Sequence, residues 1–103
     1  MPSPLEDENL PLFTVGQVSL MLEVQQAFLR RLDEFGVVRP SRSPGGQRRY
    51  SRHEITIVQY VVELTDQGMT LPGIRRILQL EAEVTLLRRE CAQLRDHFDA
   101  LSG

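Results

Sequence analysis

Hydrophobic residues recur at intervals of three and four along most of this sequence, and this pattern predicts a mainly α-helical chain. The first such run contains Val15, Val18 and Leu22. It follows a capping box in which Thr14 is the cap residue and Gln17 lies three positions later. We therefore expect a short helix that ends near residue 22.

A second helix is predicted over residues 25–35, because Gly36 is the residue type that most readily adopts the left-handed turn after a helix. Its apolar side, with Leu29 at the edge, is expected to contain Val24, Phe28, Leu32 and Phe35. Its polar side contains Gln26, Arg30, Asp33 and Glu34. Only a tight connection separates the two helices, and this arrangement is typical of a helix-turn-helix.

Two short β-like runs follow, at residues 37–39 and 48–50. The residues between them favour turns and include Pro40, Ser41, Ser43, Pro44, Gly45 and Gly46. The pattern predicts a β-hairpin beside the helix-turn-helix, and we call this hairpin the wing.

A third helix is expected to begin at a second capping box, formed by Ser51 and Glu54, and to run to Gln67 before Gly68. The segment ITIVQYVV within it is ambiguous, since β-branched residues also favour strands. The cap, the glycine and a length of about sixteen residues favour a buried helix.

A fourth helix can be capped by Thr70, with Pro72 tolerated in its first turn, and Leu71, Ile74 and Leu78 would pack it on the domain. From Ile77 onward, apolar residues alternate spacings of three and four as in a coiled coil. This seam consists of Ile77, Leu80, Val84, Leu87, Cys91, Leu94, Phe98 and Leu101. It extends for roughly 37 Å. A small domain cannot cover that length, so we expect a homodimer.

The net charge of −2 hides a strong segregation of charge. Residues 30–52 sum to +5, whereas residues 1–29 sum to −4 and residues 53–103 to −3. The chain has no lysine, so every basic side chain is a guanidinium, which suits bidentate contacts with phosphate or guanine.

These arginines make double-stranded DNA the expected partner, because guanidinium groups on a helix and an adjacent wing can contact the backbone on either side of a groove. Glutamine and arginine at the start and outer face of the second helix can also reach base edges. The candidate DNA-binding residues from this argument are Gln25, Gln26, Arg30, Arg31, Arg42, Arg48 and Arg49. For Arg30 the alternative is an ordinary surface ion pair with Glu34.

Several functional classes are not expected from this sequence. The chain has a single cysteine and lacks a membrane-spanning run or a signal-like start, so we expect a cytoplasmic, nucleoid-associated protein. Cys91 lies in the seam as a small hydrophobe, and His53 and His97 are isolated. Without a nucleophile–base pair or a phosphate-binding loop, we expect no enzyme, no metal site and no cofactor.

Residues 12–84 resemble the DNA-binding half of the MerR family, with the heat-shock repressor branch most similar. The motifs that carry the resemblance are FTVGQVSLM, FLRRLDEFGVVRP, GGQRRYS and GMTLPGIRRILQLEAEV. The resemblance implies a winged helix-turn-helix and a dimerisation helix. It also implies DNA contacts by Arg30, Arg48 and Tyr50, and in that branch a chaperone as regulatory partner.

The sequence therefore predicts a mainly α, MerR-like winged helix-turn-helix with a long C-terminal coiled-coil helix. The expected domains are a disordered acidic tail (1–12), a winged DNA-binding domain (13–79) and the coiled coil (80–103). The expected function is that of a bacterial transcriptional regulator, with repression favoured, that binds an inverted repeat as a homodimer and lacks its own ligand-sensing domain.

Two alternatives remain open at this point. The chain could be a protein-interaction adaptor that uses the coiled coil, which the apolar residues Phe28 and Leu32 motivate. It could instead be an excisionase-like protein that bends DNA. The direction of the coil is open too, since the family resemblance implies antiparallel helices. Pairing of Glu83 with Arg88 and of Glu90 with Arg95 would suit parallel ones.

Overall fold

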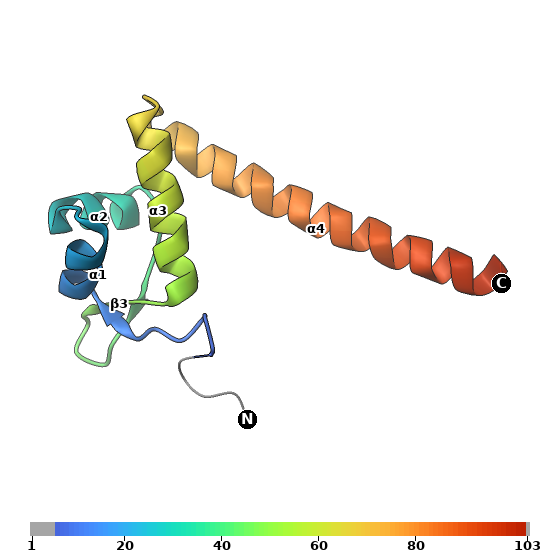
Figure 1. The fold of residues 1–103 in the computed structure, drawn as a ribbon, viewed down its shortest axis with the longest axis horizontal. Helices are drawn as coiled ribbons and strands as arrows, with labels where there is room; N and C mark the ends of the chain where they lie inside the picture. Colours follow the sequence, from blue (N-terminus) through green and yellow to red (C-terminus); the bar gives the residue numbers. More distant parts are fainter. Residues whose placement is uncertain (1–5, 103) are drawn as a thin grey trace.

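The computed structural model describes residues 6–102 and confirms a mainly α-helical fold with a small sheet and a long terminal helix (Figure 1). The elements in chain order are β1 (Phe13–Thr14), α1 (Val15–Leu22), α2 (Gln26–Glu34), β2 (Ser41–Arg42), β3 (Arg48–Tyr50), α3 (Arg52–Asp66) and α4 (Leu71–Ser102).

The predicted helix boundaries are confirmed by their caps. The Thr14 hydroxyl accepts the backbone N–H of Gln17, and the Ser51 hydroxyl accepts that of Glu54, so both capping boxes form. The Thr70 hydroxyl likewise accepts the N–H of Gly73 at 3.2 Å in the first turn of α4. The ambiguous segment ITIVQYVV is helical and lies within α3.

The connection between α1 and α2 is as tight as expected. Glu23 adopts a left-handed backbone conformation with φ of 54°, and the hydroxyl of Ser19 donates a hydrogen bond to the carbonyl of Val24. These features turn the chain within three residues, so the helix-turn-helix prediction is confirmed.

The prediction of a strand at residues 37–39 is wrong. Gly36 takes φ of 69°, and the N–H of Val37 donates to the carbonyl of Leu32 at 2.8 Å while the N–H of Gly36 donates to that of Asp33. This is the Schellman pattern that closes a helix, and Val37 is buried together with Val38. The β-branched pair therefore ends α2 and fills the core.

The sheet has three antiparallel strands in the order β1-β3-β2. The strand expected at residues 48–50 is present as β3, and it is the central strand. Its partner in the wing is β2 at residues 41–42, and a further partner, β1, was not predicted. The pairing of Phe13 with Tyr50 joins the start of the domain to the base of the wing.

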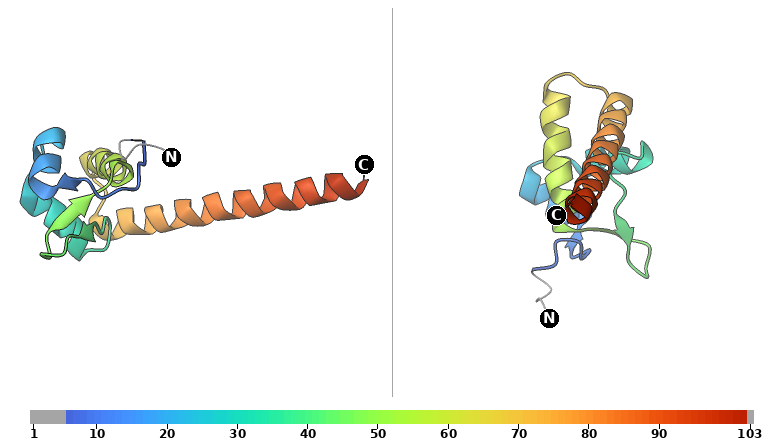
Figure 2. Two further views of the ribbon diagram at one scale, coloured as in Figure 1. Left: turned by 90° about the horizontal axis from the view of Figure 1, so that it is seen from below. Right: turned by 90° about the vertical axis from the view of Figure 1, so that its right-hand side faces the viewer.

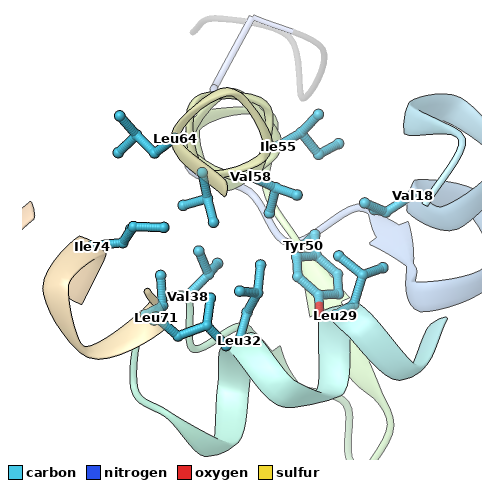
Figure 3. Close-up of a cluster of buried hydrophobic side chains, with 12 residues drawn as sticks. Val18, Leu29, Leu32, Val38, Tyr50, Ile55, Val58, Leu64, Leu71 and Ile74 are labelled. Atoms are coloured by element: carbon cyan, nitrogen blue, oxygen red, sulfur yellow. The ribbon is translucent and has the colours of Figure 1, made fainter. Parts of the chain in front are cut away.

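The core is formed where α1, α2, α3, β3 and the first turns of α4 meet (Figure 3). Leu29 and Leu32 of α2 are fully buried, whereas Phe35 is 44% exposed. The expectation that Leu29 lies at the edge of the apolar side is therefore wrong. Leu29 is central because Tyr50 of β3 and Val18 of α1 cover that flank of α2 (Figure 3).

Helix α4 begins in the domain and then leaves it as a straight arm (Figures 1 and 2). Leu71 and Ile74 are buried and Leu78 is partly buried, as expected, but every residue from 80 to 102 is exposed. The radius of gyration is 17.3 Å, against about 13 Å for a compact chain of this size. The boundary expected after residue 79 thus falls inside a continuous helix, at the point where burial stops.

The start of the chain is described only from residue 6, so residues 1–5 of the expected disordered tail lie outside the described residues. Between residues 6 and 12, Asp7 accepts the N–H of Asn9, and the carbonyl of Glu8 accepts the N–H of His53 at 2.9 Å. These contacts place the segment beside the start of α3, and the disorder of the tail stays a prediction.

Candidate nucleic-acid interface

Helix α2 presents two different flanks on either side of its exposed face. The flank towards the wing carries Gln26, Arg30 and Asp33, which follow one another at helical spacing. The opposite flank carries Phe28 and Arg31, which line hollows shared with Thr65 of α3. The two adjacent arginines of α2 therefore face different surroundings, and only Arg30 projects beside the wing.

Gln25 and Gln26 lie at the start of α2 and are exposed. The side-chain amide of Gln26 lies close to Gly16, so the first turns of α1 and α2 are neighbours. Arg30 is exposed as well, and among residues 6–102 it makes no ion pair with Glu34. The ion pair between Arg30 and Glu34 is therefore not formed, and the guanidinium of Arg30 is available to a ligand.

The arginines of the wing divide between the two faces of the sheet. Arg48 and Tyr50 share one face of β3 because they are two residues apart, and Arg49 projects from the other. Arg42 of β2 lies directly opposite Arg48. Arg42 and Arg48 are therefore turned towards α2, and Arg49 hydrogen-bonds to the side chain of Gln47 at 3.4 Å on the outside of the wing.

One carboxylate oxygen of Asp33 binds both inward-facing arginines. Oδ2 of Asp33 accepts Nε of Arg48 at 2.8 Å and Nη2 of Arg42 at 3.1 Å. The side chains of Asp33 and Arg48 are 16% and 20% exposed, so water screens this pair only partly. The sequence pattern does not indicate these two ion pairs, because it places Asp33 only on the polar face of α2.

Tyr50 does not lie on the surface, which corrects its expected role as a DNA contact. It is 1% exposed, and its hydroxyl is buried without a hydrogen-bond partner among the described residues. Burial raises the pKa of Tyr50 to about 12, although the positive charge of Arg48 lowers it in part. Tyr50 is a core residue beneath the wing arginines.

The wing and α2 both project from the side of the domain that lies away from the arm of α4 (Figures 1 and 2). This side therefore carries Gln25, Gln26 and Arg30 on a helix and Arg42, Arg48 and Arg49 on a hairpin. The guanidinium and amide groups of these side chains have the chemistry of phosphate and base-edge recognition.

The seam of α4 is exposed from Leu80 onward. The expected dimerisation residues Leu80, Val84, Leu87, Cys91, Leu94, Phe98 and Leu101 are all at the surface of the arm. Within residues 6–102, no group of three His, Cys, Asp or Glu side chains is placed to hold a metal ion. Over the same residues, no helix has the length and apolar character needed to span a membrane.

Comparison with protein families matches residues 13–81 to the family described as "MerR HTH family regulatory protein". The chain is similar to the putative heat shock protein HspR of Streptomyces coelicolor, with 34% identity over 88 residues that cover 84% of this chain and 58% of that protein. It is also similar to the HTH-type transcriptional regulator GlnR of Bacillus anthracis, with 28% identity over 77 residues that cover 75% of this chain and 60% of GlnR.

Among solved structures, the chain is similar to HiNmlR, described as a MerR family regulator lacking the sensor domain, bound to promoter DNA. The TM-score is 0.59 at 19% identity, over 87% of this chain and 84% of that one. At this identity the likeness concerns the fold. The chain spans 58% and 60% of the lengths of HspR and GlnR.

Proposed function

Because the chain belongs to the MerR HTH family of regulatory proteins, we propose that it is a sequence-specific DNA-binding transcriptional regulator that acts as a homodimer. The observation that carries the proposal is that α2, with its exposed Arg30, and the arginine-rich wing lie on one side of the domain. The promoter-bound state of the structural neighbour HiNmlR supports the same assignment.

In the proposed complex, α2 enters the major groove and the wing lies along the adjacent backbone. Gln26 and Arg30 project from the flank of α2 towards the wing, where amide and guanidinium groups can pair with adenine and guanine edges. Gln25 is exposed at the N-cap of α2 and can reach a base edge from there. Arg48 and Arg49 of the wing contact phosphates, which position the protein without reading sequence. Arg31, on the other flank of α2, contributes less to this surface.

The homodimer is proposed to form through the seam of α4. Leu94, Phe98 and Leu101 are 66%, 72% and 74% exposed, which is costly for a row of large apolar side chains on an isolated helix. Pairing with a second copy would bury them. A two-fold dimer places its two DNA-binding domains in symmetric positions, so the proposed operator is an inverted repeat.

Repression is the proposed mode of regulation, since a dimer that occupies a promoter can act by occlusion alone. Similarity to HspR motivates a protein partner as the controlling signal, with a chaperone as the candidate. The domain boundaries of the proposal are those expected from the sequence, with residues 13–79 as the DNA-binding domain and residues 80–103 as the dimerisation helix.

The proposal is tested by selecting bound fragments from random double-stranded DNA with the purified protein. The expected result is enrichment of an inverted repeat. Enrichment of a lone half-site would contradict the dimer, and enrichment of flexible sequences without a repeat would support the DNA-bending alternative. No enrichment would support the adaptor alternative and overturn the proposed function.

A further inference from the structure

We propose that Asp33 positions the wing relative to α2 and thereby sets how strongly the protein prefers its specific DNA site over random DNA. The inference rests on the proposed DNA-binding function and assigns within it a role to an acidic residue. Asp33 itself is not expected to contact DNA, because its carboxylate would repel phosphate. It acts through Arg42 and Arg48 and is therefore a positioning residue.

The wing contains a contact between two like charges. Arg42 and Arg48 lie directly opposite each other on neighbouring antiparallel strands and face the same side. Side chains in that relation approach closely, and two like charges there destabilise the hairpin. The carboxylate of Asp33 reaches both guanidinium groups and offsets their repulsion.

Asp33 lies on a part of α2 that the core holds in place, and its side chain links this part of the helix to the wing. Asp33 lies in the last turns of α2, between buried Leu32 and the Schellman turn at Gly36, so its backbone is held by the core. Between residues 6 and 102, Asp33 makes the side-chain hydrogen bonds that join the hairpin β2–β3 to α2. Two other side-chain hydrogen bonds at the hairpin tip stay within it: the N–H of Gln47 donates to the hydroxyl of Ser43, and Nη1 of Arg42 donates to the carbonyl of Gly46.

The ion pairs with Asp33 leave part of the Arg48 guanidinium available for DNA. Arg48 uses Nε to bind Asp33, and its two Nη atoms have no hydrogen-bond partner among the described residues. Because the guanidinium group is planar, fixing Nε also fixes the direction in which the Nη atoms point. Arg42 uses Nη2 for Asp33 and Nη1 for the carbonyl of Gly46, so it braces the tip of the wing.

Asp33 therefore has opposite effects on the affinity for random DNA and on the affinity for the specific site. For random DNA, the carboxylate only competes with phosphate for the two arginines and weakens binding. For the specific site, it holds Arg48 in the one position that fits while α2 contacts the bases, which reduces the ordering cost of binding. Removing the carboxylate should therefore strengthen random binding and weaken the preference.

The experiment compares Asp33→Asn with Glu34→Gln, which removes the same charge from the next residue of α2, an exposed one that makes no bond to the wing. Affinities for the selected inverted repeat and for random DNA are measured at several salt concentrations. We expect Asp33→Asn to lower the ratio of the two affinities at least tenfold. For random DNA, the slope of log affinity against log salt should also become steeper, by about 0.9 for each additional phosphate that the freed arginines neutralise. Glu34→Gln should shift both affinities by the same factor.

An unchanged affinity ratio in Asp33→Asn, with shifts equal to those of Glu34→Gln, would overturn the inference and leave the proposed function intact. A lack of any preferred site in the unsubstituted protein would instead overturn the proposed function. Should Asp33→Asn not fold by circular dichroism, Asp33→Glu provides the test. It retains the charge but displaces it by one methylene, so the ratio should fall without a rise in random binding, and an unchanged ratio would again contradict the inference.

Discussion

At the scale of single residues, the direction of each side chain matters as much as its chemical type. The sequence predicts a candidate interface of arginines in which Arg42, Arg48 and Arg49 form one patch. Alternation along β3 shows that Arg48 shares a face with buried Tyr50, and this signal was present in the sequence. The sequence contains no signal for the ion pair between Asp33 and Arg48, because fifteen residues separate the two and only the folded wing brings them together.

Replacement of Tyr50 by phenylalanine tests the placement of this residue in the core. The Tyr50→Phe substitution removes a buried hydroxyl that has no partner among the described residues, so the free energy of unfolding should stay the same or rise by about 1 kcal/mol. Urea denaturation measures this change. DNA affinity should not change, and a tenfold loss of affinity in a fully folded variant would show that the hydroxyl contacts DNA.

Tyr50 also predicts a dependence of stability on alkaline pH. Its pKa is about 12 in the folded protein and 10.0 in a solvated side chain, so the unfolded chain loses this proton first. Its contribution to stability is complete below about pH 10 and is lost as the pH rises towards about 12, at about 1.4 kcal/mol per pH unit. Urea denaturation at intervals from pH 9 to 12 should show a smaller decline for Tyr50→Phe. An identical decline in both proteins would contradict the burial of Tyr50.

At the scale of elements, the sequence predicted the helices well because their ends are encoded locally. The side chains of Thr14, Ser51 and Thr70 cap the starts of α1, α3 and α4. Gly36 and Gly68 adopt positive φ after the ends of α2 and α3. Strands were predicted poorly because pairing is not local. Val37 and Val38 have the β-branched side chains typical of strands, but they end α2 and pack in the core. Phe13 and Thr14 form a strand only because they pair with β3.

The capping of α3 gives a prediction at this scale. Ser51 is 4% exposed and its hydroxyl accepts the N–H of Glu54 at 3.1 Å. Ser51→Ala should therefore lower the free energy of unfolding by about 1 kcal/mol. Thr85→Ala is the matched control, because it removes a hydroxyl from an exposed position inside α4. Thermal and urea denaturation of both variants provide the measurement, and equal effects would argue against a capping role for Ser51.

At the scale of the whole molecule, the chain consists of a small domain and an arm, and the family match confirms the resemblance inferred from its motifs. The heptad pattern predicted a long helix, and α4 is continuous from Leu71 to Ser102. The partner of that helix cannot be read from a single chain. The dimer therefore stays a prediction.

Substitution in the seam tests the dimer. Val84→Asp places a charge at a seam position, where it would be unpaired and dehydrated in a dimer, so sedimentation should show monomers with an intact DNA-binding domain. Gln93→Asp adds the same charge to α4 outside the seam and should remain dimeric. A dimer that persists in Val84→Asp at micromolar concentration would exclude the proposed interface.

The salt dependence of DNA affinity tests the central claim, that the wing and α2 together bind DNA. Arg48→Ala should weaken binding to all DNA sequences and flatten the slope of log affinity against log salt. The expected change is about 0.9 for each phosphate that is no longer neutralised, or about 2 for a dimer. Arg89→Ala, which removes the same charge from exposed α4, should leave the slope unchanged. If Arg48→Ala retains the slope and affinity of the unsubstituted protein, the wing does not bind DNA and the account of this interface is wrong.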